Sequence, residues 1–180
     1  MNSAVIFGGC GFIGLYFAEK ALDINLFDNL YLVDIREPED SVGKLKFKKL
    51  LDTGKVKFLK RDVRENLNDI LIEKNLTTIL NFAAIHREPG HQAYEYGETN
   101  ISGAKNVCDF AKFNNCKNII FTSSIAVYGP GEHEKNESTE ARPSTPYGKS
   151  KLEAEIVHLI WQKEDPANRI LSICRPGVVF

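Results

Sequence analysis

The chain has 180 residues, enough for one domain with a substantial core and too many for a disulfide-stapled miniprotein. Hydrophobic residues make up 43% and charged residues 26%, a composition typical of globular proteins and unlike that of disordered chains. The 23 Lys and Arg nearly balance the 24 Asp and Glu, which removes the broad electrostatic basis for binding nucleic acid or an anionic membrane. We therefore expect an enzyme or binding domain with neither partner.

The four cysteines are scattered along the chain, at Cys10, Cys108, Cys116 and Cys174. They form no CxxC pair and no zinc-like spacing with histidine, so we expect free thiols and no bound metal. The first residues lack a basic segment with a cleavage site, and no apolar run approaches the ~20 residues of a membrane span. These features predict a cytoplasmic protein.

Short apolar runs alternate with segments of helical periodicity from end to end. The predicted strands cover residues 4–7, 30–33, 56–59, 78–82, 118–122 and 170–174. The predicted helices cover residues 12–22, 44–51, 67–76, 93–114 in one or two pieces, and 146–163. Apolar strands separated by helices predict an α/β fold, a doubly wound parallel sheet of Rossmann type in three α/β/α layers with strand order 3-2-1-4-5-6. The polar stretch 130–146 is either a flap over a site or an ordinary surface loop.

A glycine-rich segment, GGCGFIG, joins the first predicted strand to the first predicted helix. It satisfies GxGxxG through Gly9, Gly11 and Gly14, and GxxGxxG when Gly8 replaces Gly9. Without Cβ atoms, backbone amides at a helix N-terminus can approach a pyrophosphate closely. Asp34 ends the second strand, where a carboxylate accepts hydrogen bonds from both ribose hydroxyls. The joint spacing favours a dinucleotide site over a tight turn beside a solvated aspartate.

The same aspartate bears on the choice of cofactor. A carboxylate at Asp34 repels the 2′-phosphate of NADP, which favours NAD. Arg36, two residues later, offers a phosphate partner and is the one feature that favours NADP.

Tyr147 and Lys151 form a YxxxK pattern at the start of a predicted helix, and their spacing puts both side chains on one face. Tyrosine has a pKa near 10, and lowering it by ~3 units requires ~4 kcal/mol, which a neighbouring ammonium supplies. Ser124 follows the fifth strand, where its hydroxyl can bind a substrate hydroxyl or carbonyl. Each pattern alone also fits an exposed helix pair or a turn cap.

Seven segments together resemble the extended short-chain dehydrogenase/reductases, the NAD-dependent epimerase/dehydratase group that acts on nucleotide sugars. They are GGCGFIG, VDIR, RDVR, NFAA, TSSIAVYG, YGKSK and RPGVVF, and they span essentially the whole chain. The resemblance implies a catalytic triad of Ser124, Tyr147 and Lys151. It implies that NAD contacts come from Gly8, Gly11, Phe12, Ile13, Gly14, Asp34, Asp62, Val63, Phe82, Ala83, Ala84, Asn100, Tyr147, Lys151 and Pro176. Within that set, Asp62 and Val63 would contact adenine, Asn100 would support the site, and Pro176 would border the nicotinamide.

Two departures from the family pattern refine the expectation. Dehydratases of this group carry an acidic residue after the catalytic serine or threonine, whereas this chain has Ile125 and Ala126, which favours a UDP-glucose 4-epimerase-like activity. Family members have ~300 or more residues. We therefore expect residues 1–180 to be an NAD-binding Rossmann domain with the catalytic triad, without the C-terminal substrate-binding lobe.

The resemblance implies oxidation of a nucleotide sugar at C4 to a 4-keto sugar, followed by re-reduction on the other face. Tyr147 would take the proton of the C4 hydroxyl, Ser124 would orient that oxygen, and Lys151 would lower the tyrosine pKa. The alternatives are a nucleotide-sugar reductase, dehydrogenase or dehydratase and, from another class, a non-catalytic NAD-sensing domain. The substrate would lie near His86 and Arg87, unless these form a solvated loop. The exposed edge of the last strand predicts a homodimer or other homo-oligomer.

Overall fold

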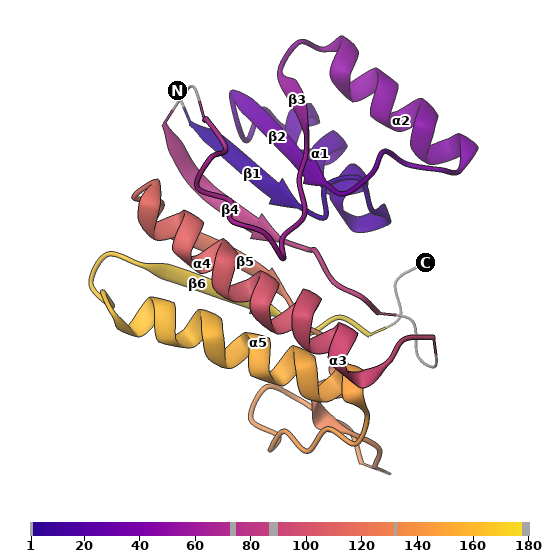
Figure 1. Cartoon of the computed structure of the whole chain (residues 1–180), viewed down its shortest axis with the longest axis vertical. Coiled ribbons are helices and arrows are strands. Elements are labelled where there is room, and N and C mark those ends of the chain that lie inside the picture. Colours follow the sequence, from indigo (N-terminus) through magenta and orange to yellow (C-terminus); the bar gives the residue numbers. More distant parts are fainter. Residues whose placement is uncertain (1, 73–74, 87–89, 132, 178–180) are drawn as a thin grey trace.

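The computed structural model describes residues 2–72, 75–86, 90–131 and 133–177. Six parallel strands form one sheet in the order β3-β2-β1-β4-β5-β6. They are β1 (Ser3–Phe7), β2 (Asn29–Asp34), β3 (Val56–Lys60), β4 (Leu76–Asn81), β5 (Asn118–Thr122) and β6 (Ile170–Cys174) (Figure 1). The doubly wound order predicted from the sequence is confirmed.

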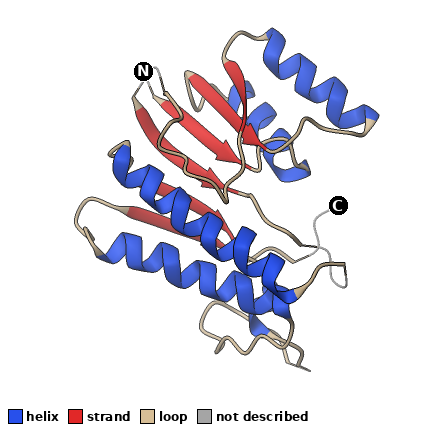
Figure 2. Cartoon of the chain, in the orientation of Figure 1, coloured by secondary structure: helices blue, strands red, loops and turns tan. Residues whose placement is uncertain are grey.

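Helices cover both faces of the sheet, which gives the three predicted layers (Figure 2). They are α1 (Phe12–Asp23), α2 (Ser41–Asp52), α3 (Ala93–Tyr96), the π-helical segment η1 (Gly97–Ser102), α4 (Gly103–Phe113), the 3₁₀ segment η2 (Ile125–Tyr128) and α5 (Pro146–Lys163). Helices α4 and α5 lie side by side over one face, and α1 lies behind the sheet.

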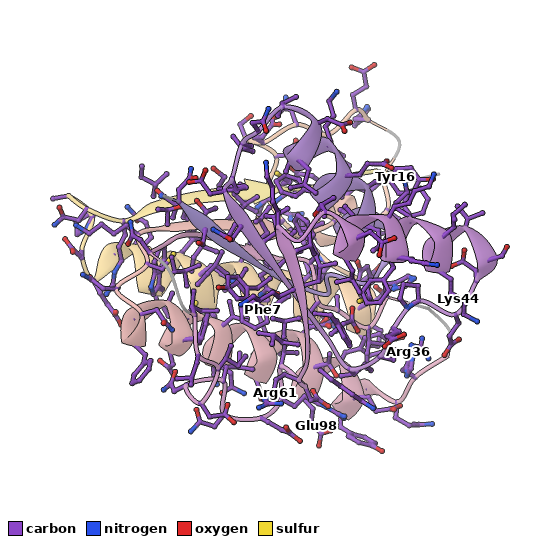
Figure 3. The ribbon with its side chains drawn as sticks, turned by 90° about the horizontal axis from the view of Figure 1, so that it is seen from above. Phe7, Tyr16, Arg36, Lys44, Arg61 and Glu98 are labelled. Carbon is purple, nitrogen blue, oxygen red and sulfur yellow. The ribbon has the colours of Figure 1, made fainter. Side chains whose placement is uncertain are left out.

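The alternation of side chains along β1 divides the core in two. Val5 and Phe7 belong to the cluster that packs against α4 and α5, while Ala4 and Ile6 belong to the cluster on the side of α1 and α2. All four side chains are fully buried, as expected for a central strand covered on both faces. Phe7 lies at the centre of the molecule in Figure 3 and meets Phe110 of α4 edge to face, with ring centroids 5.5 Å apart.

The helix expected over residues 67–76 is wrong, because the described residues there form turns before β4. The Asn66 Oδ1 accepts a hydrogen bond from the Asn68 amide at 2.9 Å, and the Ile70 amide donates to the Leu67 carbonyl at 3.0 Å. Short polar side chains of this kind compete with helical hydrogen bonding. Leu67 and Ile70 are nevertheless buried, so their helix-like spacing reflects turns that cover the core.

The predicted helix over residues 93–114 is a run of three successive segments, α3, η1 and α4. The π-helical middle segment carries Asn100, whose side chain is buried. Such π turns are rare and often occur at functional sites, because they reorient one side chain within a helix.

Strand β6 is the outer strand of the sheet, and its Ile170 side chain is 63% exposed. The homo-oligomer expected from this edge stays a prediction. Within the part of the chain that the structure describes, no helix is both long and apolar enough to cross a membrane.

Candidate active site

The glycine-rich loop between β1 and α1 lies wedged between the ends of β2 and β4. The amides of Gly8 and Gly9 both donate to the Val33 carbonyl, at 2.9 and 3.1 Å. Gly8 has a φ of +74°, and a Cβ added there would lie 2.7 Å from the Ala83 backbone nitrogen. A Cβ at Gly14 would lie 2.6 Å from the Gly8 carbonyl oxygen. Only glycine fits these two positions without moving backbone.

The N-terminus of α1 offers backbone donors at the same loop. Gly11 is the N-cap and provides no side-chain cap, and the first intrahelical bond runs from the Leu15 amide to the Gly11 carbonyl at 3.0 Å. The amides of Phe12, Ile13 and Gly14 precede that bond. Uncapped amides at the positive end of a helix, beside an exposed glycine, fit a pyrophosphate.

Asp34, at the end of β2, faces this loop. Its Oδ2 accepts a hydrogen bond from the Cys10 amide at 3.0 Å. Burial raises the pKa of Asp34, while hydrogen bonds from backbone amides, Cys10 first, oppose that rise. The exposed Arg36, labelled in Figure 3, donates to the Glu39 carboxylate at 2.9 Å. This arrangement suits an uncharged ribose edge better than a 2′-phosphate.

Asp62 and Val63 follow β3 at the same edge of the sheet. Arg64 donates from Nε and Nη2 to the Asp62 carboxylate at 2.6 to 3.0 Å, and this hydrogen bonding lowers the Asp62 pKa. The Val63 side chain is buried, and its carbonyl accepts from the Asn106 amide group of α4 at 2.8 Å. These contacts fix the loop that was expected to meet adenine.

The segments after β4, β5 and β6 meet at this carboxyl edge. The Phe82 amide donates to the Phe7 carbonyl at 2.9 Å, which brings Phe82, Ala83 and Ala84 beside the glycine loop. The Pro176 carbonyl accepts from the Ile125 amide at 3.1 Å. Pro176 therefore lies against the start of η2, where Ser124 is the cap.

Ser124 caps η2, because its Oγ accepts from the Ala126 amide at 3.1 Å. The alternative interpretation of Ser124 as a turn cap is therefore correct, since its oxygen accepts the capping hydrogen bond. The hydroxyl hydrogen is still available to donate, since a serine hydroxyl is both donor and acceptor.

The start of α5 packs directly against η2. Thr145 caps the helix through its Oγ1, which accepts from the Gly148 amide at 3.1 Å. A Cβ at Gly148 would lie 2.5 Å from the Ala126 carbonyl oxygen, so only glycine allows this approach. Tyr147, next in the chain to Gly148, is thereby brought to the segment that begins at Ser124.

Lys151 is one turn further along α5 and is only 2% exposed. Its Nζ lies 4.4 Å from the centroid of the Phe121 ring of β5, a cation–π contact. Desolvation lowers the Lys151 pKa to about 7, with the Glu155 carboxylate opposing that shift. Its protonation therefore responds to pH much nearer to neutrality than that of a solvated lysine.

His158 stacks on the same phenylalanine ring, with ring centroids 4.2 Å apart. Phe121 therefore contacts both Lys151 and His158 of the same helix. The His158 Nδ1 lies 2.7 Å from the Ala154 carbonyl and donates to it, which leaves Nε2 to accept from Asn81 at 3.3 Å. Burial lowers the His158 pKa to about 4, so the ring is neutral at physiological pH.

Asn100 links the loop after β4 to the start of α5. Its Oδ1 accepts from the Ile85 amide at 2.9 Å, and its Nδ2 donates to the Ile85 carbonyl and to Ser150 Oγ at 3.1 and 2.9 Å. The Ser150 hydroxyl donates to the Tyr147 carbonyl at 2.7 Å. With both amide donors engaged, Asn100 acts on the site by holding backbone, and its contact with NAD stays a prediction.

The structure describes one of the two residues that were expected to lie near the substrate. His86 is exposed in the loop after β4, and Arg87 lies outside the described residues. Over the described ranges there is no group of three or more His, Cys, Asp or Glu side chains that could hold a metal ion.

Sequence reasoning missed Glu155, Arg175 and Tyr128, which form a charged network beside Lys151. The available signal was spacing, since Glu155 is four residues after Lys151 and so shares its helix face. Nothing in the sequence pairs it with Arg175, because that contact depends on how β6 is placed.

A parallel sheet with a glycine-rich β1–α1 loop, an aspartate at the end of β2 and a strand order that reverses between β1 and β4 has the architecture of a dinucleotide-binding Rossmann domain. Residues 4–176 match the NAD dependent epimerase/dehydratase family. The chain belongs to this family of enzymes.

Individual relatives agree with that membership. The chain is 42% identical over 103 residues, 57% of its length and 31% of the relative's, to an N-acetyl-alpha-D-glucosaminyl-diphospho-ditrans,octacis-undecaprenol 4-epimerase of Escherichia coli O157:H7. It is 27% identical to UDP-glucose 4-epimerase 3 of Oryza sativa subsp. japonica over 181 residues, 95% of this chain and 48% of the relative. The crystal structure of UDP-glucuronic acid 4-epimerase from Bacillus cereus with NAD has the same fold, with a TM-score of 0.85 at 20% identity, covering 99% of this chain and 57% of that one. The chain thus spans about half the length of its relatives, or less.

Two glycines with similar backbone conformations give a matched test of the loop. Gly8 and Gly54 have φ values of +74° and +69°, but a Cβ at Gly54 would meet nothing within 4 Å. We expect Gly54→Ala to cost about 1–2 kcal/mol of folding free energy. Gly8→Ala should cost roughly 1–3 kcal/mol more, because backbone at Ala83 must move. Urea denaturation measures both, and equal losses would contradict the close approach.

The burial of Lys151 predicts a pH-dependent stability. Its pKa is about 7 in the folded chain and 10.5 when exposed, so the unfolded chain holds more protons between these values and stability rises with pH. Lys151→Met should therefore be more stable than the parent protein at acidic pH, by an amount on the order of a few kcal/mol, since one pKa unit corresponds to about 1.4 kcal/mol. The gap should close as pH rises toward 10.5.

Denaturation at a series of pH values measures that gap. Lys149→Met, at an exposed position of the same helix, is the control and should change stability little at any pH. A gap for Lys151→Met that does not vary with pH would show that the ammonium is solvated.

Proposed function

We propose that residues 1–180 form the NAD-binding domain, with the catalytic triad, of an NAD-dependent nucleotide-sugar 4-epimerase. The observation that carries the proposal is the packing of the start of α5 against η2. That packing brings Tyr147 and the buried Lys151 to the sheet edge where Ser124 follows β5. The names of the relatives support 4-epimerisation as the activity.

The residues at the carboxyl edge suit NAD. The uncapped amides of Phe12, Ile13 and Gly14 would hold its pyrophosphate, Asp34 its adenosine ribose, and Asp62 its adenine. Phe82, Ala83, Ala84 and Pro176 would line the remainder. When bound, NAD supplies a hydride acceptor, and later a hydride donor, for C4 of the sugar.

The chain's own residues would then manage a proton. Tyr147, as phenolate, takes the proton of the sugar C4 hydroxyl and returns it when C4 is reduced again. Lys151 stabilises the phenolate through its charge, and its own pKa of about 7 keeps that charge adjustable near neutral pH. Ser124 orients the reacting oxygen by donating its hydroxyl hydrogen, while its oxygen stays on the Ala126 amide.

The residues after Ser124 favour an epimerase over a dehydratase. Elimination of water needs an additional acid–base group, and here Ile125 and Ala126 follow the serine. A reductase or dehydrogenase would use the same triad, but each turnover would consume or produce one NADH. NADH absorbance therefore distinguishes that second candidate, because an epimerase gives no net change. A non-catalytic NAD-sensing domain would bind NAD without turnover.

The partners follow from the same proposal. A nucleotide sugar would enter beside His86, which is exposed in the loop after β4. We also propose that the protein forms a homo-oligomer, which the exposed edge strand β6 supports.

Tyr147→Phe tests the catalytic assignment. We expect NAD affinity to stay within a few-fold, since the phenol hydroxyl contributes little to binding, while epimerisation falls by about 10²- to 10⁴-fold. Calorimetry measures NAD binding, and NMR follows UDP-glucose and UDP-N-acetylglucosamine turnover by the full-length protein. Tyr94→Phe, at a position that is 65% exposed, is the control and should retain activity. A Tyr147→Phe rate above a tenth of the parent rate would mean that another group is the base.

Asp34→Ala tests the cofactor assignment. The unmodified chain should bind NAD more tightly than NADP, and Asp34→Ala should weaken NAD binding by at least roughly tenfold because charged hydrogen bonds are lost. NADP binding should weaken less or improve, since the repulsion also disappears. Arg36→Ala is the control and should change the preference little, because Arg36 is paired with Glu39. Equal affinities in the unmodified chain would refute the assignment.

A further inference from the structure

A buried carboxylate lies beside the candidate catalytic lysine, and Arg175 holds both of its oxygens. The Arg175 Nε donates to Glu155 Oε1 at 2.9 Å, and Nη2 donates to Oε2 at 2.6 Å. The Glu155 side chain is 2% exposed and that of Arg175 is 22% exposed. Such a two-pronged pair is strong and directional, and it fixes the carboxylate plane.

The remaining arm of the guanidinium reaches η2. The Arg175 Nη1 donates to the Tyr128 hydroxyl at 2.8 Å, and the guanidinium carbon lies 4.9 Å from the Tyr128 ring centroid. The Glu155 carboxylate and the Tyr128 hydroxyl together raise the Arg175 pKa, so its charge is permanent. One side chain therefore joins α5, η2 and the segment after β6, the three segments that converge on the site.

Glu155 and Lys151 are four residues apart on α5, so their side chains share one face of the helix. The carboxylate already acts on the ammonium, since it opposes the desolvation that lowers the Lys151 pKa. Glu155 and His158 of α5 interact electrostatically with Lys151. Arg175 and Tyr128 bind one another beside Glu155, and the Tyr96 ring of α3 lies against the Tyr147 ring. Among these groups Glu155 is the only carboxylate, and because burial keeps His158 neutral, Lys151 is the cation left for it once Arg175 is removed.

We propose that Arg175 is a positioning residue of the site: by occupying both oxygens of Glu155 it prevents that carboxylate from capturing the ammonium of Lys151. A buried carboxylate without its cation is costly and takes the closest available one. Capture would pull the Lys151 Nζ one turn along the helix, away from Tyr147 and from the edge where the cofactor would lie. The inference rests on the proposed function only for the role of Lys151.

The test measures the pKa of Lys151 directly, without cofactor or turnover. NMR of the chain with isotope-labelled lysine side chains gives each lysine pKa, and Lys151→Met identifies the resonance. In the unmodified chain the value should be about 7. In Arg175→Gln the freed carboxylate should raise the Lys151 pKa by about 1–3 units, as an opposite charge at close range does.

A double variant isolates the cause. In Glu155→Gln/Arg175→Gln no carboxylate is available, so the Lys151 pKa should return to about 7 or fall below it. If Arg175 acted only by stabilising the fold, the single and the double variant would have the same Lys151 pKa. NAD affinity should follow the same pattern, weaker in the single variant and recovered in the double variant.

Arg169 provides a matched control at the other end of α5. It also pairs with a glutamate, Glu164, at 2.7 Å, and it stacks over Trp161 at 5.1 Å with an 18% exposed side chain. Arg169→Gln should destabilise the chain and leave the Lys151 pKa at about 7. A similar rise in both single variants would mean that loosening of the fold, and not the freed carboxylate, is responsible.

If Arg175→Gln does not fold, Arg175→Lys keeps the charge but loses the two-pronged contact, and it should give a smaller rise. An unchanged Lys151 pKa in whichever of these variants folds overturns the proposal. Failure of the unmodified chain to bind NAD would instead refute the proposed function, and the pKa comparison would still decide the role of Arg175.

Discussion

The burial of one ammonium group is the constraint on which this site depends. Lys151 is 2% exposed and lies against the Phe121 ring, so its charge has lost nearly all contact with water. An uncompensated buried charge costs several kcal/mol, and it persists only where the surrounding fold is stable enough to impose it. The sheet provides that stability, because β5 carries Phe121 and has a paired strand on each side. A lysine so placed can change its protonation state near neutral pH, which a solvated lysine cannot.

Two neighbours on α5 set the electrostatic surroundings of Lys151. His158, which stacks on the same Phe121 ring, is kept neutral by burial and donates to a backbone carbonyl, so it adds no second positive charge. Glu155 supplies a negative charge that Arg175 holds in place. Removing the Glu155 carboxylate would therefore change the electrostatics of Lys151. Lys151, Glu155 and His158 of α5 are therefore electrostatically coupled, and the positions of their charged groups matter as much as the net charge of the three residues.

Features that depend on local sequence were predictable here. The strand order followed from apolar strands alternating with helices, because right-handed crossovers leave few topologies. The glycine loop was predictable from the spacing of its glycines. The structure shows why glycine is needed at position 8, because an added Cβ there would lie 2.7 Å from the Ala83 backbone nitrogen. The helix over residues 67–76 failed because Leu67 and Ile70 are buried by turns, which periodicity alone cannot distinguish from a helix.

Features that depend on distant contacts were not predictable. The π-helical turn that carries Asn100, and the bonds from Asn100 to Ile85 and Ser150, require three elements to be in place together. The same holds for Arg175, which is 20 residues from Glu155 and meets it only because β6 pairs with β5 beneath α5. Spacing revealed the catalytic candidates because Tyr147 and Lys151 share one helix. The groups that hold those candidates in place come from other elements and become visible only in the folded chain.

The geometry also explains why the glycine loop and the surroundings of Lys151 are built differently. Around Gly8 and Gly14 the chain packs backbone against backbone, which excludes any side chain there, and the first amides of α1 have no side-chain cap. Around Lys151 it uses side chains whose charges compensate one another at short range. Backbone cannot change its charge with pH, so it suits a site that must hold an anion constantly. Titratable side chains suit the other end, because moving a proton requires groups whose protonation state responds to their neighbours.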